Sequence, residues 1–169
     1  DFFESGNKRF LSMEYIEGPT VDQEIKKSDR IEQERALEIA ARVAEALEYA
    51  GDSGLIHRDI KPENIMIAKD GCVKVADMGL VKQVDDSGEG ALTMAGERLG
   101  TPYYMSPEQI RETKNVDHRA DIYSLGASLF HMVTGRRPYI GKTPVEIMQN
   151  VLKGDADFND EERGFLHDS

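Results

Sequence analysis

The spacing of apolar and polar residues changes from strand-like to helical along the chain. Residues 1–16, DFFESGNKRFLSMEYI, place aromatic and aliphatic residues on both sides of Gly6 and Asn7, which predicts two strands around a turn. Residues 65–77, IMIAKDGCVKVAD, repeat this arrangement around an Asp-Gly pair. Both segments are therefore expected to form β-hairpins.

Helical spacing and capping residues predict the first two helices. Thr20 and Gln23 have the spacing of a capping box and are expected to start a short helix. A longer helix is expected behind a cap at Asp29 with Glu32, and it ends at the glycines that follow residue 50. Its apolar positions recur every three or four residues: Leu37, Ala40, Ala44 and Leu47.

Three further helices are expected after the second hairpin. Ser106, followed by proline and then by Gln109, has the features of a helix start, and so has Thr143. Residues 117–135, DHRADIYSLGASLFHMVTG, are expected to form a helix capped by Asp117 and buried at the centre of a bundle, since nearly every face is apolar. Strands come first and helices after, with one hairpin between the helices, which is an α+β pattern.

Composition limits the classes of protein to consider. The chain has 169 residues, of which 39% are hydrophobic, so it has the length of one domain and enough apolar residues for a core. Its net charge of −11 argues against general binding to nucleic acid. No apolar run approaches the roughly 20 residues of a membrane span. The single cysteine, Cys72, and the lack of a leader at the start of the chain favour a reducing, cytoplasmic compartment.

Four polar residues around the second hairpin suggest phosphoryl transfer. The amide of Asn64 and the carboxylate of Asp77 are oxygen ligands that suit a hard cation such as Mg²⁺. Asp59 is a second carboxylate, which could orient a hydroxyl and accept its proton. Lys61 shares a face with Asp59 in an extended loop and could neutralise a transferring phosphoryl group.

Three motifs in order, HRDIKPEN, DMG and GTPYYMSPE, closely resemble those of the eukaryotic-type Ser/Thr protein kinases, particularly bacterial members. The resemblance implies a partial kinase domain over residues 1–169. Residues 1–16 correspond to the last strands of the small β lobe and the start of the hinge. Residues 17–169 correspond to most of the mainly helical large lobe, and the domain is expected to be incomplete at both ends.

The resemblance also implies roles for the four polar residues. Asp59 corresponds to the catalytic-loop aspartate, Asn64 and Asp77 to the metal ligands, and Lys61 to the lysine that contacts the phosphate. Thr101 corresponds to a threonine that holds its loop near the substrate hydroxyl. The implied cofactors are ATP and Mg²⁺, with Mn²⁺ as an alternative metal.

For the nucleotide, the resemblance points to the segment SMEYIEG and to the second hairpin. Backbone groups near Glu14 and Ile16 are expected to meet the adenine. Met13 is expected at the back of the pocket and Met66 against one face of the base. Glu63 is a further candidate beside the nucleotide, and together with the acidic composition it suggests basic substrate peptides.

Several other residues match supporting positions of the family. His57 is expected to be structural, packing beneath Met78, which replaces the usual phenylalanine of the DMG motif. Asp121 lies in an apolar helix and should therefore bond backbone donors, anchoring the catalytic loop. Glu108 corresponds to a residue that pairs with an arginine on a later helix.

The segment between residues 81 and 100 resembles an activation loop. Phosphate on Thr93 is expected to order this loop through Arg58 and Lys82. The alternative, that Thr93 is an unmodified loop residue, stays open at this stage.

The expected function is transfer of the γ-phosphoryl group of Mg-ATP to Ser or Thr hydroxyls of proteins. A glycine loop, a strand lysine and a helix glutamate would complete the phosphate grip, and none is found here, so the isolated chain is expected to be inactive. A pseudokinase or regulatory binding module is the alternative. Small-molecule kinases are disfavoured, because GTPYYMSPEQ resembles a peptide-docking segment. No nucleic acid or membrane segment is expected, and the oligomeric state and any anchor elsewhere stay open.

Overall fold

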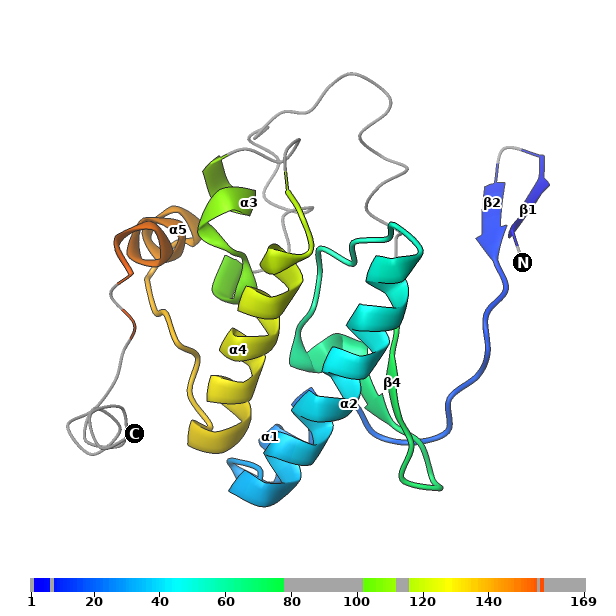
Figure 1. The fold of residues 1–169 in the computed structure, drawn as a ribbon, viewed down its shortest axis with the longest axis horizontal. Coiled ribbons are helices and arrows are strands. Elements are labelled where there is room, and N and C mark those ends of the chain that lie inside the picture. The colour runs from blue at the N-terminus through cyan, green and yellow to red at the C-terminus, as the bar shows by residue number, and fades with distance from the viewer. Residues whose placement is uncertain (1, 7, 78–101, 112–115, 155, 157–169) are drawn as a thin grey trace.

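A computed structural model describes residues 2–6, 8–77, 102–111, 116–154 and 156. It contains a small hairpin followed by a body in which helices pack around a second hairpin (Figure 1). The elements, in chain order, are β1 (Phe2–Ser5), β2 (Lys8–Leu11), α1 (Val21–Ser28), α2 (Gln33–Asp52), the 3-10 turn η1 (Pro62–Asn64), β3 (Ile65–Ile67), β4 (Val73–Val75), the 3-10 turn η3 (Pro102–Tyr104), α3 (Pro107–Arg111), α4 (Arg119–Thr134) and α5 (Pro144–Lys153).

Both predicted hairpins are present, and both are antiparallel. In the first, Phe2 pairs with Leu11, and in the second, Ile65 pairs with Val75. The β1–β2 hairpin stands apart from the helical body and is joined to it by an extended segment (Figure 1). The order of strands first and helices after confirms the expected α+β pattern.

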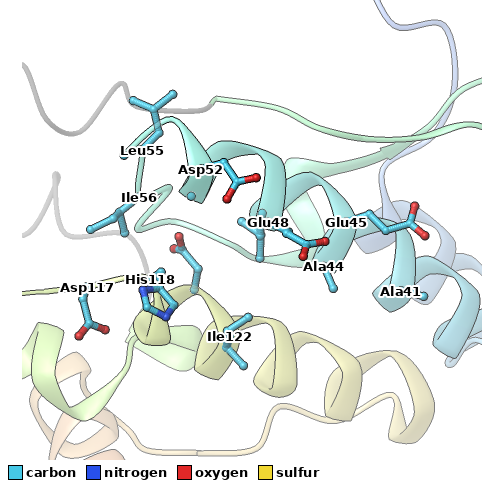
Figure 2. Close-up of a pocket in the computed structure, with 14 residues that line it drawn as sticks. Ala41, Ala44, Glu45, Glu48, Asp52, Leu55, Ile56, Asp117, His118 and Ile122 are labelled. Carbon is cyan, nitrogen blue, oxygen red and sulfur yellow. The ribbon is translucent and has the colours of Figure 1, made fainter.

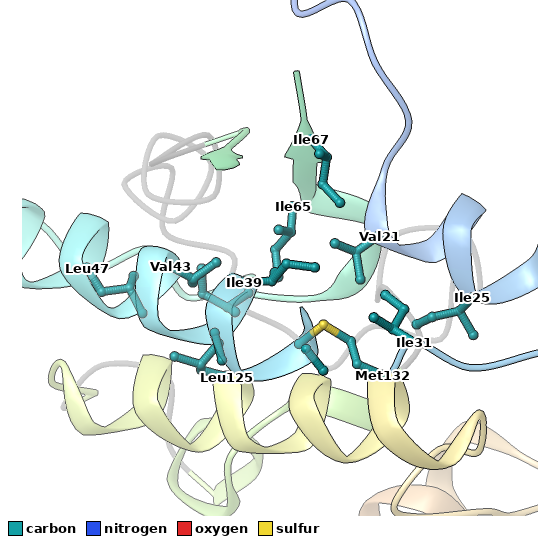
Figure 3. Packing of buried hydrophobic residues seen from close by; sticks show 13 residues of the cluster. Val21, Ile25, Ile31, Ile39, Val43, Leu47, Ile65, Ile67, Leu125 and Met132 are labelled. Atoms are coloured by element: carbon teal, nitrogen blue, oxygen red, sulfur yellow. The ribbon is translucent and has the colours of Figure 1, made fainter. Parts of the chain in front are cut away.

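The main core lies where α2 packs against α4, beneath the β3–β4 hairpin. Ile39 and Val43 of α2 face Leu125 and Met132 of α4 (Figure 3), and all four are buried. Removing one such side chain from water contributes about 2 kcal/mol. This core supports the loop of residues 57–64, which leads directly into β3.

Three of the predicted helix starts are confirmed by side-chain hydrogen bonds. Thr20 and Gln23 form a reciprocal capping box at α1, and Ser106 and Gln109 form the same pair of bonds before α3. At α5, Thr143 accepts a hydrogen bond from the backbone N–H of Glu146. Each pair satisfies backbone donors that the first helical turn leaves free.

The predicted caps of the two longest helices are wrong. Asp29 ends α1 with a φ of 66°, and α2 is capped by Glu32, whose carboxylate accepts from the backbone N–H of Arg35 at 3.1 Å. The central helix begins at Arg119 rather than directly after Asp117, although Asp117 still accepts from the backbone N–H of Arg119. Short polar side chains reach backbone donors from several nearby positions, so sequence spacing alone does not fix the cap.

Two apolar residues are more exposed than the helical pattern predicts. Leu37 is 49% exposed, so the buried face of α2 runs through Ile39 and Val43. Ile122 of α4 is 54% exposed, although the rest of that helix is largely buried as expected.

Gly135 is the C-cap of α4 and cannot be replaced without strain. Its φ is 70°, and a Cβ atom here would lie 2.1 Å from the carbonyl oxygen of Asp29. We expect Gly135→Ala to lower the free energy of unfolding by about 2 kcal/mol, because the left-handed conformation and the backbone clash both oppose the methyl group.

Chemical denaturation of the two variants Gly135→Ala and Gly51→Ala would measure this effect. Gly51 lies within α2, and a methyl group added there would meet nothing within 4 Å, so its replacement is expected to leave stability unchanged or raise it. Equal stability of the two variants would show that the α4 cap tolerates a side chain.

Candidate active site

The loop that carries HRDIKPEN is anchored by a carboxylate from the central helix. Asp121, 3% exposed in α4, accepts hydrogen bonds from the backbone N–H groups of His57 at 2.8 Å and Arg58 at 2.7 Å. These are the backbone donors that the sequence predicts for this buried carboxylate. Arg58 has a φ of 66°, so the two bonds hold the chain in a left-handed turn immediately before Asp59.

His57 is fully buried, and its two ring nitrogens have different partners. Nε2 lies 2.9 Å from the carbonyl oxygen of Ala76, and Nδ1 accepts from the backbone N–H of Asp59 at 3.2 Å. Because a carbonyl needs a donor and an amide N–H needs an acceptor, we assign the neutral tautomer with hydrogen on Nε2. His57 thus connects Asp59 to the end of β4, as a structural residue would.

Asp59, Lys61 and Asn64 form one hydrogen-bonded cluster. The Asp59 Oδ2 atom accepts from Lys61 Nζ at 2.7 Å and from Asn64 Nδ2 at 2.9 Å. The side chains of Asp59 and Lys61 are 37% and 24% exposed, so the cluster is open to solvent on one side. Within the described residues, Asp59 Oδ1 accepts no hydrogen bond and is available to a substrate group.

The orientation of the Asn64 amide is fixed by the same cluster. Its Nδ2 atom donates to both the backbone carbonyl and Oδ2 of Asp59, so the amide oxygen lies on the opposite side. The Asn64 carbonyl accepts from the backbone N–H of Ala76 at 2.8 Å, which brings the neighbouring residue Asp77 to this loop. Asp77 is exposed and has a φ of 60°.

The pair Asn64 and Asp77 fits a hard cation chemically, because one amide oxygen and one carboxylate are offered and water or phosphate oxygens would complete the coordination. The described part of the chain contains no group of three or more His, Cys, Asp and Glu side chains that could hold a metal. A cation held by these two residues would take its further oxygen ligands from water or phosphate.

The predicted nucleotide-base residues lie along the extended segment after β2 and in the second hairpin. Met13 is 57% exposed and Ile16 is half-buried, while Met66 is half-buried in β3. Glu14 forms an ion pair with Lys74 of β4, and this bond raises the pKa of Lys74. No hydrogen bond or ion pair among the described residues joins Met13, Glu14 or Ile16 to the Asp59 cluster.

Two other predicted residues are exposed. Glu63 lies in η1 between Lys61 and Asn64, and Glu108 lies in the first turn of α3. The remaining predicted site residues lie outside the described residues, so their roles stay predictions: Met78, Lys82, Thr93 and Thr101.

Sequence reasoning missed the contact made by Gln109. Its Oε1 caps α3 through the backbone N–H of Ser106, and its Nε2 donates to the carbonyl oxygen of Arg58 at 2.9 Å. One amide thus joins the segment around residue 106 to the catalytic loop. The capping-box spacing predicts that Gln109 belongs to a helix. A contact between residues 51 positions apart produces no pattern in the local sequence that could predict it.

A second missed feature is the buried pair Tyr104 and His131. The Tyr104 hydroxyl lies 2.7 Å from His131 Nδ1, and we assign it as the donor to a neutral ring; the carbonyl of Tyr104 accepts from the Ser124 hydroxyl at 2.7 Å. Burial raises the pKa of Tyr104, and burial followed by the nearby Arg137 lowers the pKa of His131. Both groups are therefore neutral near pH 7, which agrees with a Tyr-to-His hydrogen bond.

A groove of about 890 Å³ lies on another part of the surface, between α2 and the start of α4 (Figure 2). Its walls carry alanines and Ile122, and Glu45, Glu48, Asp52 and Asp117 lie at its sides. The catalytic-loop cluster of Asp59, Lys61 and Asn64 is not part of its lining. The groove is therefore separate from the candidate active site, although Asp121 lines it.

Among the residues that the structure describes, no helix combines the length and the apolar character needed to cross a bilayer.

Comparison of the sequence with known proteins identifies its family. A family model for the protein kinase domain matches residues 1–163. A probable serine/threonine-protein kinase of Clostridium acetobutylicum is 42% identical over 142 residues, which cover 84% of this chain and 21% of that protein. Serine/threonine-protein kinase PknB of Mycolicibacterium smegmatis is 39% identical over 151 residues, which cover 89% of this chain and 24% of that protein.

The chain spans about a fifth to a quarter of the length of these relatives. The match covers the catalytic-loop cluster, the β3–β4 hairpin and α4, which are the parts whose contacts are described above. The chain belongs to the protein kinase family.

Proposed function

We propose that the full-length protein transfers the γ-phosphoryl group of Mg-ATP to Ser or Thr hydroxyls of protein substrates. The observation that carries this proposal is the arrangement of Asp59, whose Oδ2 accepts from Lys61 and Asn64 while Oδ1 accepts no hydrogen bond from the described residues. A carboxylate held in this way has one oxygen fixed and a second one that could accept from a substrate group. The names of the bacterial Ser/Thr kinase relatives support the same reaction.

Asp59 would accept the proton of the substrate hydroxyl through Oδ1. The hydroxyl oxygen then bonds to the γ-phosphorus while the bond from phosphorus to the β,γ-bridging oxygen breaks, and ADP leaves. Lys61, whose Nζ lies 2.7 Å from Asp59 Oδ2, would neutralise charge on the transferred group. Asn64 and Asp77 would hold Mg²⁺, which supplies positive charge to the phosphates when bound.

Three further assignments belong to this proposal. The adenine would lie near Met13, Glu14, Ile16 and Met66, with Glu63 beside the nucleotide. Arg58, whose buried Nε has no hydrogen-bond partner among the described residues, would receive a loop phosphate. We place this region in the cytoplasm, where ATP is available and an exposed, unpaired Cys72 stays reduced.

Lys61 gives a direct test of the proposal. In the full-length protein, Lys61→Ala is expected to lower kcat for transfer from labelled Mg-ATP to a protein substrate by roughly a hundred-fold, because a charge beside the transferred group is lost. Lys69→Ala is the matched control, since Lys69 is an exposed lysine that pairs only with Glu17 within the described residues. It is expected to keep wild-type kcat.

The same assay distinguishes the alternative of a pseudokinase. EDTA is expected to abolish transfer by the wild type. A full-length protein that binds Mg-ATP but transfers no phosphate to protein at any substrate concentration would contradict the proposal and favour a binding role.

A further inference from the structure

We propose that His131 is a positioning residue that makes docking of the protein substrate depend on pH, by holding Tyr104 only in its neutral form. The proposal rests on the proposed kinase function, because η3 and Tyr104 lie in the segment GTPYYMSPEQ, which resembles a peptide-docking segment. His131 itself does not touch the substrate in this account. It acts through the Tyr104 hydroxyl, from which it accepts a hydrogen bond at 2.7 Å.

Tyr104 is held at both ends by α4. Its hydroxyl meets His131 Nδ1 near the end of the helix, and its carbonyl meets the Ser124 hydroxyl two turns earlier. Both rings are buried, at 6% exposed for Tyr104 and 7% for His131. Tyr104 is therefore held by two hydrogen bonds to one helix and by Arg137 at its hydroxyl, and His131 is the one of these partners that titrates in the range of about pH 5 to 8.

The neighbouring surface of this segment carries Tyr103, whose ring is covered by the Arg137 guanidinium at 4.0 Å. Tyr103 and Tyr104 meet edge to face, with ring centroids 6.4 Å apart. A movement of Tyr104 would thus displace Tyr103 and Arg137, both of which are half-exposed. Loss of the buried hydrogen bond between Tyr104 and His131 would in this way move residues of the docking surface.

The charged groups around His131 oppose its protonation on balance. Arg137 follows α4 and Lys26 lies on α1, and both cations disfavour a second positive charge. Asp22 of α1 favours the charge, but its carboxylate is already paired with Lys26 at 2.6 Å. Glu63 of η1 faces Tyr104 and disfavours its ionisation.

Protonation would also remove the acceptor. A protonated imidazole can only donate, so the bond would have to reverse, and the Tyr104 oxygen would then face two cationic donors, His131 and Arg137, while the Tyr104 hydrogen would lose its buried acceptor. Since the pKa of His131 is lowered in the packed arrangement, this arrangement is complete above the ordinary value of 6.5 and is lost as the pH falls below it. The equilibrium between packed and released Tyr104 shifts by at most about ten-fold for each pH unit below that value.

The test measures KM and kcat of the full-length protein with myelin basic protein as the probe substrate and saturating Mg-ATP. From about pH 7.5 to about pH 5.5, the wild-type KM is expected to rise about three-fold to ten-fold, with a smaller change in kcat. His131→Gln keeps a hydrogen-bond acceptor that does not titrate, so its KM is expected to vary much less with pH. Tyr104→Phe is expected to have a raised KM at every pH.

Two further variants distinguish a positioning role of His131 from a general effect of pH on the protein. His118 is exposed near the other end of α4, so His118→Gln is expected to keep the wild-type pH profile. Ser124→Ala removes the second bond to Tyr104 and is expected to raise KM equally at all pH values. A His131→Gln profile identical to that of the wild type would overturn the proposal.

A second measurement, hydrogen exchange, tests the proposal without an assay of phosphoryl transfer. Hydrogen exchange of residues 102–106, corrected for the intrinsic pH dependence, is expected to accelerate from about pH 7.5 to about pH 5.5 in the wild type and not in His131→Gln. Unchanged protection in the wild type would reject the inference. Absence of transfer at every pH, with the exchange difference intact, would reject the proposed function alone.

Discussion

Asp59→Asn is expected to lower kcat of the full-length protein roughly a thousand-fold, with KM for ATP nearly unchanged. The asparagine oxygen would take the place of Oδ2, because Lys61 Nζ and Asn64 Nδ2 both donate there. Its NH₂ group would then occupy the place of Oδ1 and could not accept a proton from the substrate. Steady-state phosphoryl transfer and nucleotide binding by calorimetry would measure the two effects separately.

Asp52→Asn is the matched control for this change. Asp52 is an exposed carboxylate at the end of α2, and no hydrogen bond or ion pair among the described residues joins its side chain to the cluster, so the variant is expected to have wild-type kcat. Near-normal transfer by Asp59→Asn would mean that another group accepts the proton, and the assignment of Asp59 would fall.

Asp121→Asn is expected to lower the free energy of unfolding by about 3 kcal/mol and to reduce kcat as well. An asparagine side chain has one acceptor, whereas the backbone N–H groups of His57 and Arg58 both need one here. The NH₂ group of the variant would face a buried donor. The left-handed turn at Arg58 would lose half of its support, and Asp59 would lose its position.

Denaturation with urea would measure the stability change, and hydrogen exchange of the His57 and Arg58 amides would locate it. Ser128→Ala, in the same helix, removes a buried hydroxyl that bonds only the carbonyl of Ser124 within the described residues. Ser128→Ala is expected to lower the free energy of unfolding by less than about 1 kcal/mol. If Asp121→Asn and Ser128→Ala have the same free energy of unfolding, the hydrogen bonds of Asp121 contribute no more to stability than the single bond of the Ser128 hydroxyl.

The sequence was sufficient to predict the hairpins, three caps and the acceptor role of Asp121, because these features follow from local patterns or from a single physical rule. A carboxylate in an apolar helix must find donors, whichever they are. The caps at Asp29 and Asp117 are wrong for different reasons: Glu32 takes the backbone donor of α2, whereas α4 begins one residue later, after His118, and Asp117 still accepts from the Arg119 N–H. Which residue caps a helix therefore depends on the direction in which the chain enters that helix.

The contacts that sequence reasoning missed join residues far apart in the chain. Gln109 bonds the carbonyl of Arg58, and Tyr104 bonds His131, 27 residues away. Neither pair forms a motif, since a glutamine near a helix start and a histidine in an apolar helix both have ordinary explanations. Only the packing of η3 against α4 brings the second pair together.

The two uses of the Gln109 side chain limit how kinase segments can be exchanged between proteins. The same amide closes the capping box of α3 with its oxygen and holds the Arg58 carbonyl with its nitrogen. A chimera that imports residues 106–109 with glutamate at the last position would keep the cap but lose the donor to Arg58, and an apolar residue there would lose both contacts. The segment of residues 102–109 and the loop of residues 57–64 should therefore be transplanted together, although 51 positions separate the two residues that join them.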